Sequence, residues 1–199
     1  MQHLTASEAA FVAGVSVPQV QRIIDEKILP AELYSTDPIR AFRTDACVPI
    51  AFYFQTAESL IASARLRIIG DALEHCYTWD DWKNYVFEER SVTVHFFDIW
   101  KATDDRFQQL ARVNKEVVED PEILSGTPVF KRTRVPVYDI AAMVEAGVSL
   151  NEILETYPSL KDYQVALAPI YARVFPPKGR PKRTQSNSPV AKSYIKKRQ

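Results

Sequence analysis

The chain has 199 residues, 46% of them hydrophobic, which is enough for one or two domains with a real core. Two isolated cysteines, Cys47 and Cys76, exclude a disulfide framework. The N-terminus has no signal-peptide pattern, and the most apolar window, Val48–Phe54, is far too short to span a bilayer, so we expect a cytoplasmic protein without a membrane partner. The net charge is zero, but the charged residues are unevenly distributed along the chain: residues 178–199 contain eight basic and no acidic side chains. Such a tail can bind an anionic partner or fold back on the acidic remainder of the chain.

Residues 1–44 predict an N-terminal helix-turn-helix. Thr5 with Glu8, and Ser16 with Gln19, have the spacing of capping boxes, so one helix should begin after Thr5 and the next after Ser16. The turn between them reads Ala-Gly-Val-Ser at 13–16 and is centred on a glycine. Proline, serine and aspartate residues, which favour turns, predict a loop over residues 31–44.

Residues 45–118 predict a middle region of helix and strand, suited to dimerisation or partner contact. Apolar residues recur at helical spacing from Asp45 to about Cys76. β-branched and aromatic residues over 92–97 predict a strand, which can pair with residues 85–87. A further helix is expected over 104–118.

Residues 119–175 predict a small hairpin followed by three helices. The hairpin would join Val129-Phe130 to Arg134-Val135, and the helices are expected over about 137–145, 149–156 and 160–174. A second Ala-Gly-Val-Ser copy at 146–149 precedes the middle helix, which Ser149 and Glu152 should cap. Residues 176–199 read as a disordered basic tail.

The expected fold class is therefore mainly α with a small β component. It combines an N-terminal helix-turn-helix, an α/β middle region and a C-terminal homeodomain-like or winged three-helix module.

The second N-terminal helix has an outward polar face that suits DNA. Its outward residues are predicted to be Ser16, Gln19, Gln21, Arg22 and Lys27. Glutamine pairs bidentately with adenine and arginine with guanine, so Gln19 and Arg22 are candidate base readers. Asp25 and Glu26 weigh against this interpretation because they would repel phosphates. The alternative is an ordinary helical hairpin.

Two further basic segments are candidate DNA contacts. Lys131, Arg132 and Arg134 form a basic turn that can lie on phosphates, unless Arg134 pairs with Asp139 or Glu122. In the tail, Lys-Gly-Arg-Pro-Lys-Arg is close to an AT-hook core, and a generic polybasic tail is the alternative. The tail residues concerned are Lys178, Arg180, Lys182 and Arg183.

Catalytic chemistry finds little support in the sequence. The three histidines are scattered without ligand spacing, and no phosphate loop or nucleophile elbow is present. Acidic pairs at 80–81, 88–89 and 104–105 are expected at helix starts or in loops, where acids complement the helix dipole or stay solvated. We therefore expect no enzyme, no metal site and no cofactor.

Two resemblances bear on function. The first 27 residues or so resemble the opening helices of MerR-type regulators, through their spacing and Gly-Val-Ser turn. Residues from about 117 to 171 strongly resemble the family known as domain of unknown function 433. The matching residues are Asp120-Pro121, Gly126, Pro128-Val129, Thr133-Arg134, Pro136-Val137, Ala146-Gly147-Val148-Ser149, Glu152-Ile153-Leu154 and Tyr157-Pro158.

That second resemblance implies an antitoxin of a bacterial type II toxin–antitoxin operon, often encoded beside a PIN-domain ribonuclease toxin. It predicts a homodimer that binds operator DNA, represses its own operon and neutralises the toxin by direct binding. Two positions depart from the family pattern: Arg132 replaces a glycine in the turn, and Pro169 replaces an alanine and should kink the last helix. The alternatives are a stand-alone regulator and a protein-interaction module that never meets DNA.

Overall fold

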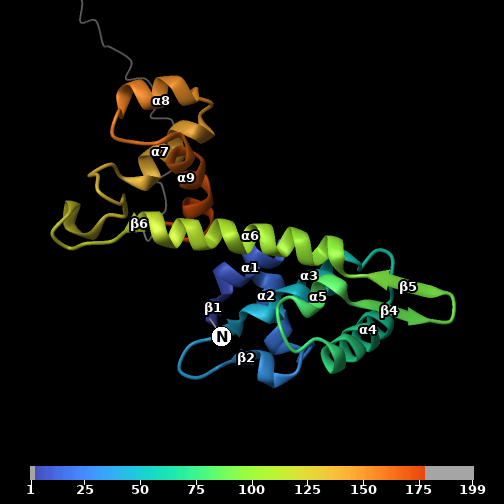
Figure 1. Cartoon of the computed structure of the whole chain (residues 1–199). Helices are drawn as coiled ribbons and strands as arrows, with labels where there is room; N and C mark the ends of the chain where they lie inside the picture. Colours follow the sequence, from blue (N-terminus) through green and yellow to red (C-terminus); the bar gives the residue numbers. More distant parts are fainter. Residues whose placement is uncertain (1–2, 178–199) are drawn as a thin grey trace, which may run out of the picture.

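The computed structural model describes residues 3–177, which fold mainly into helices with three small antiparallel sheets among them (Figure 1). Within this range no helix is long and apolar enough to cross a membrane. The expected class, mainly α with a small β component, is confirmed. The tail residues Lys178, Arg180, Lys182 and Arg183 lie outside the described residues.

The N-terminal elements form a helix pair whose ends join a small sheet. They are β1 His3–Thr5, α1 Ala6–Ala13, α2 Val17–Asp25, the 3-10 turn Ala31–Leu33, β2 Tyr34–Ser35, β3 Ala41–Arg43 and the 3-10 turn Thr44–Ala46. The strands pair in the order β1-β3-β2, with Leu4 and Tyr34 both opposite Phe42. The prediction of a loop over 31–44 is therefore wrong. Strands of two or three residues carry too little alternation to be seen in sequence, and they are held by the buried Leu4 and Phe42.

Both predicted capping boxes are present at the starts of α1 and α2. The Glu8 amide donates to Thr5 Oγ1 at 3.3 Å, and the Thr5 amide donates to Glu8 Oε2 at 2.8 Å. At α2 the Gln19 amide donates to Ser16 Oγ at 3.4 Å and the Ser16 amide donates to Gln19 Oε1 at 2.8 Å. These bonds satisfy backbone donors that the first helical turn leaves free, so the helix starts follow from local sequence.

The middle region consists of α3 Cys47–Gln55, α4 Ala62–His75, α5 Asp81–Asn84, β4 Val86–Glu89, β5 Val92–His95 and α6 Phe97–Glu116. The predicted hairpin is confirmed, with β4 antiparallel to β5. The helical stretch expected over 45–76 is interrupted at 56–61, where the chain turns between α3 and α4. The helix expected from 104 begins at Phe97, because Ile99 and Trp100 pack into the core from a helix and not from a strand, while Phe97 stays exposed.

The C-terminal elements are β6 Val117–Val118, the 3-10 turn Leu124–Gly126, β7 Val129–Phe130, α7 Val137–Glu145, α8 Leu150–Thr156 and α9 Asp162–Val174. The three helices are confirmed, and α9 continues through Pro169. The hairpin predicted between Val129-Phe130 and Arg134-Val135 is present in part, through a bond from the Phe130 amide to the Val135 carbonyl and an antiparallel bridge from Val129 to Pro136. The pairing of β7 with β6, which places Val117 opposite Phe130, was not predicted.

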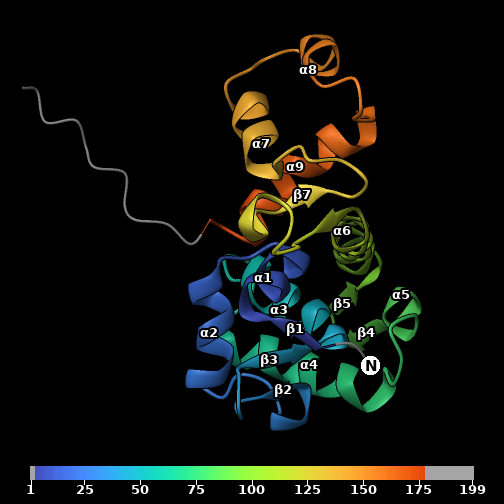
Figure 2. The same cartoon turned by 90° about the vertical axis from the view of Figure 1, so that its left-hand side faces the viewer.

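The long helix α6 joins two hydrophobic clusters. Its Leu110 belongs to the cluster built by the N-terminal and middle elements, whereas its Val113 belongs to the cluster of α7, α8 and α9. Figures 1 and 2 show α1 to α3 on one side of α6 and α7 to α9 on the other. Val174 of α9 returns to the first cluster, so the two clusters are linked by α6 and α9 together.

A side chain of α6 also fixes the turn between α1 and α2. Gly14 ends α1 with a left-handed φ of 68°, and the guanidinium of Arg106 lies against it. Arg106 donates to the carbonyl of Val12 at 3.1 Å, and Gln55 donates to the carbonyl of Ala13 at 3.2 Å. A cation and an amide therefore satisfy carbonyls that the last turn of α1 leaves free.

The two Ala-Gly-Val-Ser turns allow a matched stability test. Gly14→Ala should destabilise the chain more than Gly147→Ala, because both positions have positive φ but only a Cβ at Gly14 would meet Arg106, at 2.5 Å. We expect Gly147→Ala to cost about 1 kcal/mol of unfolding free energy from backbone strain alone. Gly14→Ala should cost this amount and also displace Arg106 from the Val12 carbonyl. Denaturant unfolding of both variants measures the difference, and equal losses would show that Arg106 does not hold the turn.

Candidate nucleic-acid interface

The second helix of the N-terminal pair, α2, places apolar residues inside and polar residues outside, as the sequence predicts. Val20 and Ile23 are fully buried. Ser16, Gln21, Arg22 and Lys27 are exposed, and Gln19 is half-buried. Gln19, Gln21 and Arg22 thus lie on a helix that is anchored in the first hydrophobic cluster, with Ser16 at its N-cap and Lys27 just beyond its C-terminal end. Whether this surface meets DNA stays a prediction.

The side-chain amide of Gln19 is already engaged in capping α2. Its side-chain oxygen accepts bonds from the Ser16 amide at 2.8 Å and the Ser16 hydroxyl at 2.9 Å. Bidentate pairing with adenine needs both the oxygen and the nitrogen of the amide. As capped, Gln19 therefore cannot read adenine in this way, and Gln21 is the better-placed glutamine on the same helix.

Two charged residues of α2, Arg22 and Asp25, each have a partner of opposite charge. Arg22 donates to both carboxylate oxygens of Glu26, at 2.8 and 3.1 Å, and its guanidinium lies over the ring of Phe54 at 5.7 Å. The bond from Arg22 lowers the pKa of Glu26. Asp25 pairs with Arg40, which comes from the chain between β2 and β3, at 2.9 Å. An anion would have to replace these carboxylates in order to bind Arg22 or Arg40.

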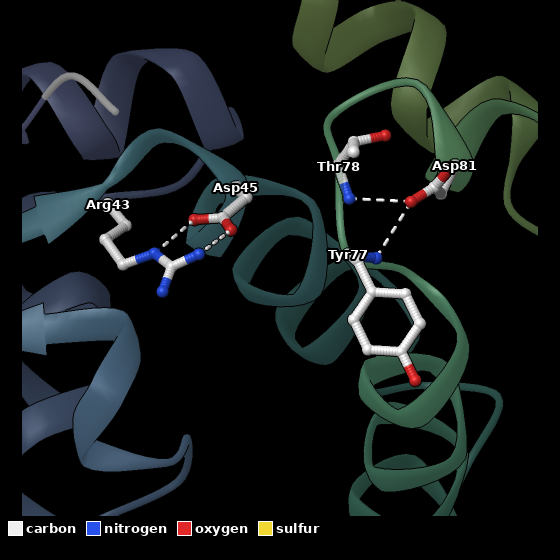
Figure 3. Close-up of polar contacts among 5 residues, drawn as sticks. All are labelled: Arg43, Asp45, Tyr77, Thr78 and Asp81. Atoms are coloured by element: carbon white, nitrogen blue, oxygen red, sulfur yellow. Dashed lines mark hydrogen bonds and ion pairs between the residues drawn. The ribbon is translucent and has the colours of Figure 1, made fainter.

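Sequence reasoning did not single out Arg40 or Arg43, because the segment that carries them was expected to be a loop. Arg43, at the end of β3, donates to both oxygens of Asp45 at 3.0 and 2.5 Å (Figure 3). Arg43 is half-buried and bound to Asp45, so Arg40 is the more accessible cation beside α2. The strands β2 and β3 on either side of Arg40 are too short to show alternation in the sequence, so the pairing that positions Arg40 could not be predicted.

The basic turn after β7 exposes all three of its cations. Lys131, Arg132 and Arg134 are exposed, and Arg134 forms no ion pair with Asp139 or Glu122 in the described part of the chain. Arg132 has a φ of 65°, which explains why a glycine is expected at this position of the turn. Lys131 and Arg132 also line a cavity together with Lys115 and Lys161, whereas Arg134 does not.

The second Ala-Gly-Val-Ser turn leads into an acidic helix. Ser149 and Glu152 form the predicted capping box, with the Ser149 amide donating to Glu152 Oε2 at 3.0 Å. Bonds from the Ser149 hydroxyl and amide lower the pKa of Glu152, which favours its charged form. Glu155 is exposed on the same helix. This face would repel a phosphate backbone, so α8 is a poor counterpart of α2.

In each acidic pair at least one carboxylate has a structural partner, although not all of the pairs lie where the sequence predicted. Asp81 begins α5 and accepts from the amides of Tyr77 and Thr78 at 2.8 and 2.6 Å (Figure 3), and these bonds lower its pKa. Residues 88–89 lie in β4, and residues 104–105 lie inside α6, not at a helix start. Asp104 accepts from the indole of Trp79 at 3.0 Å, and Asp105 pairs with Lys101.

Residues 3–177 show neither a cluster of metal ligands nor an activated thiol. No group of three or more histidine, cysteine, aspartate or glutamate residues in that range is arranged to hold a metal ion. Both cysteines are buried and free, as expected. Burial raises the pKa of Cys76 to about 11, so its thiol is protonated at neutral pH.

Comparisons with known proteins identify a family region and a relative. The model described as "Protein of unknown function (DUF433)" matches residues 117–172, which confirms that resemblance. The uncharacterized protein y4eO of Sinorhizobium fredii (strain NBRC 101917 / NGR234) is 41% identical over 187 residues, covering 89% of this chain and 83% of that protein. The crystal structure of Rv2018 from Mycobacterium tuberculosis is similar with 15% identity and a TM-score of 0.33, covering 83% of this chain and 96% of that one.

Arg132 and Arg90 provide a matched pair for a test of backbone strain. Arg90 lies at the turn between β4 and β5 with a φ of 53°, and Arg132 has a φ of 65°. Replacing either with glycine should stabilise the chain by about 0.5–1 kcal/mol, which is the strain removed less the greater flexibility of glycine in the unfolded chain. Thermal and denaturant unfolding measure the gain. A loss of stability on Arg132→Gly would mean that its side chain contributes more than its backbone costs.

Proposed function

The chain belongs to the family of the uncharacterized protein y4eO, with a DUF433 region at residues 117–172, and from this premise we propose that it is a DNA-binding antitoxin. It represses its own operon and neutralises a PIN-domain ribonuclease toxin by direct binding. We propose no catalytic role and no cofactor. The toxin partner rests on the resemblance of the DUF433 region to antitoxins, and the DNA partner rests on the surface of α2.

The observation that carries DNA binding is an exposed polar helix face on a rigid support. Val20 and Ile23 anchor α2 in the core, and Arg106 and Gln55 fix the turn that precedes it. A helix that enters the major groove needs such support, because base contacts require positions held to a fraction of an ångström. Gln21 and Arg22 then meet base edges, and Ser16, Lys27 and Arg40 meet phosphates.

Arg22 reaches DNA by exchanging its partner. The pair with Glu26 is exposed on both sides, and such pairs contribute little because water screens them. A guanine edge or a phosphate offers the same bidentate geometry that Glu26 now provides. DNA binding should therefore be strongly salt-dependent and sensitive to the charge of Glu26.

Repression works by occupancy. A symmetric dimer would place two copies of α2 in successive major grooves, about 34–36 Å apart, on a palindromic operator. Arg134 and the basic tail residues Lys178, Arg180, Lys182 and Arg183 add contacts to the DNA backbone. The middle region over 78–118 and the tail are the two candidate segments for contact with the toxin.

We expect Arg22→Ala to weaken binding of the full chain to DNA upstream of its own gene about tenfold, the value of one bidentate base contact. Glu26→Gln should tighten binding, because it releases Arg22 and removes a charge that repels phosphate. Fluorescence anisotropy over a range of salt concentrations measures both effects. The control is Lys101→Ala. This substitution removes an exposed cation from α6 that, like Arg22, pairs with an acidic residue four positions later in the chain. The control should leave DNA affinity unchanged, and an affinity that is also unchanged by Arg22→Ala and Glu26→Gln would contradict a role for α2.

Neutralisation is tested separately from repression. Co-expression with the nuclease encoded beside this gene should relieve the growth arrest that the nuclease causes, and the Arg22→Ala variant should relieve it equally well. Cell growth together with the amount of each protein provides the readout. Persistent arrest with normal accumulation of this protein would refute the antitoxin role, while retained DNA binding would then identify a stand-alone regulator.

A further inference from the structure

A cavity in the C-terminal half gathers positive charge from three separate segments. It has a volume of about 380 Å³ and lies between the end of α6, the turn after β7 and the start of α9. Its charged walls are Lys115, Lys131, Arg132, Lys161 and Glu116. Four cations thus face one carboxylate, although the chain up to residue 177 carries more acidic than basic side chains.

The one carboxylate in the wall does not neutralise these cations. Glu116 Oε2 accepts from the hydroxyl of Tyr163 and from the amide nitrogen of Gln164, both at 3.2 Å. Among residues 3–177, none of the four cations takes part in an ion pair. Like charges that are held close together repel one another, so the cavity favours any anion that enters it.

The shape and position of the cavity suit a phosphate group. The 13-residue helix α9 begins beside it at Asp162, and the start of a helix carries partial positive charge and free amides. Ser159 adds a hydroxyl group to the wall, whereas the Tyr163 hydroxyl already donates to Glu116. The guanidinium of Arg132 presents a planar fork of donors, while the lysines act as point charges.

A second cavity of about 440 Å³ adjoins the first and shares Lys115, Glu116 and Tyr163 with it. Its remaining walls include the apolar side chains of Ala166, Leu167 and Ile170 from α9, together with Arg112 from α6. A basic cavity therefore lies beside a more apolar one, with Lys115, Glu116 and Tyr163 lining both. Concave sites of this size bury small molecules, whereas a duplex presents a broad convex surface.

We propose that the two neighbouring cavities bind a small phosphorylated molecule, with its phosphate among Lys115, Lys131, Arg132 and Lys161 and its organic part along Ala166, Leu167 and Ile170. This assignment separates Lys131 and Arg132 from Arg134, which lies outside the cavity wall and stays a DNA contact. The site is independent of α2, so it goes beyond the proposed function and does not rest on it.

Isothermal titration calorimetry of the full chain tests the site with adenosine 5′-monophosphate, adenosine and inorganic pyrophosphate as probes. We expect the monophosphate and pyrophosphate to bind at low salt and adenosine not to bind. Arg132→Gly should weaken both phosphorylated probes about tenfold or more, since it removes a charge-assisted contact. This variant keeps its fold because glycine suits the positive φ at that position. Arg90→Gly makes the same change of charge on a distant turn and should leave binding unchanged.

Three results would overturn the proposal: no binding of either phosphorylated probe, equal binding by the parent chain and Arg132→Gly, or binding of adenosine as tight as that of its monophosphate. The duplex used for α2 separates the two functions. If Arg132→Gly weakens DNA binding while neither small probe binds, the cavity belongs to the nucleic-acid surface. Arg22→Ala should leave binding of the small probes unchanged whether or not α2 binds DNA.

Discussion

The long helix α6 sets the geometry of both candidate sites, and its contact with the end of α1 is made by Arg106. Its guanidinium holds the Val12 carbonyl and fills the space beside Gly14, so the start of α2 is fixed relative to α6. The same helix continues into the second hydrophobic cluster and ends at Glu116, which binds Tyr163 and Gln164 of α9. One helix therefore positions the polar face of α2 near its middle and the basic cavity at its end.

The two Ala-Gly-Val-Ser turns show how identical local sequence acquires different roles. Both turns place glycine at positive φ and begin the next helix with a capping box. The first turn is enclosed by Arg106 and is followed by a helix whose charges are balanced. The second has open space around Gly147 and leads to Glu152 and Glu155. Local sequence thus determines the turn, and tertiary surroundings determine what the following helix can bind.

The parts of the fold predicted from sequence depend on short-range interactions. The capping boxes, the hairpin of β4 and β5 and the three C-terminal helices are fixed by residues a few positions apart. The pairing of β1 with β3 joins residues about 40 positions apart, and the basic cavity joins Lys115 to Lys161. Neither leaves a periodic signal, so neither could be predicted. The early start of α6 was missed because aromatic and β-branched residues favour strands unless packing overrides them.

The surface of α2 and the basic cavity both favour anions, but they differ in whether their cations are paired with carboxylates. On α2, Arg22 and Asp25 already have partners of opposite charge, so an anion gains only by exchange for an exposed carboxylate that water then solvates. In the cavity no carboxylate needs to leave, because Glu116 is occupied by uncharged donors and the four cations are without ion pairs in the described chain. Exchange suits a large polyanion that replaces many partners at once and releases counterions. A cavity whose cations are not paired with carboxylates suits a small ligand, because such a ligand makes few contacts and each of them must contribute to the binding free energy.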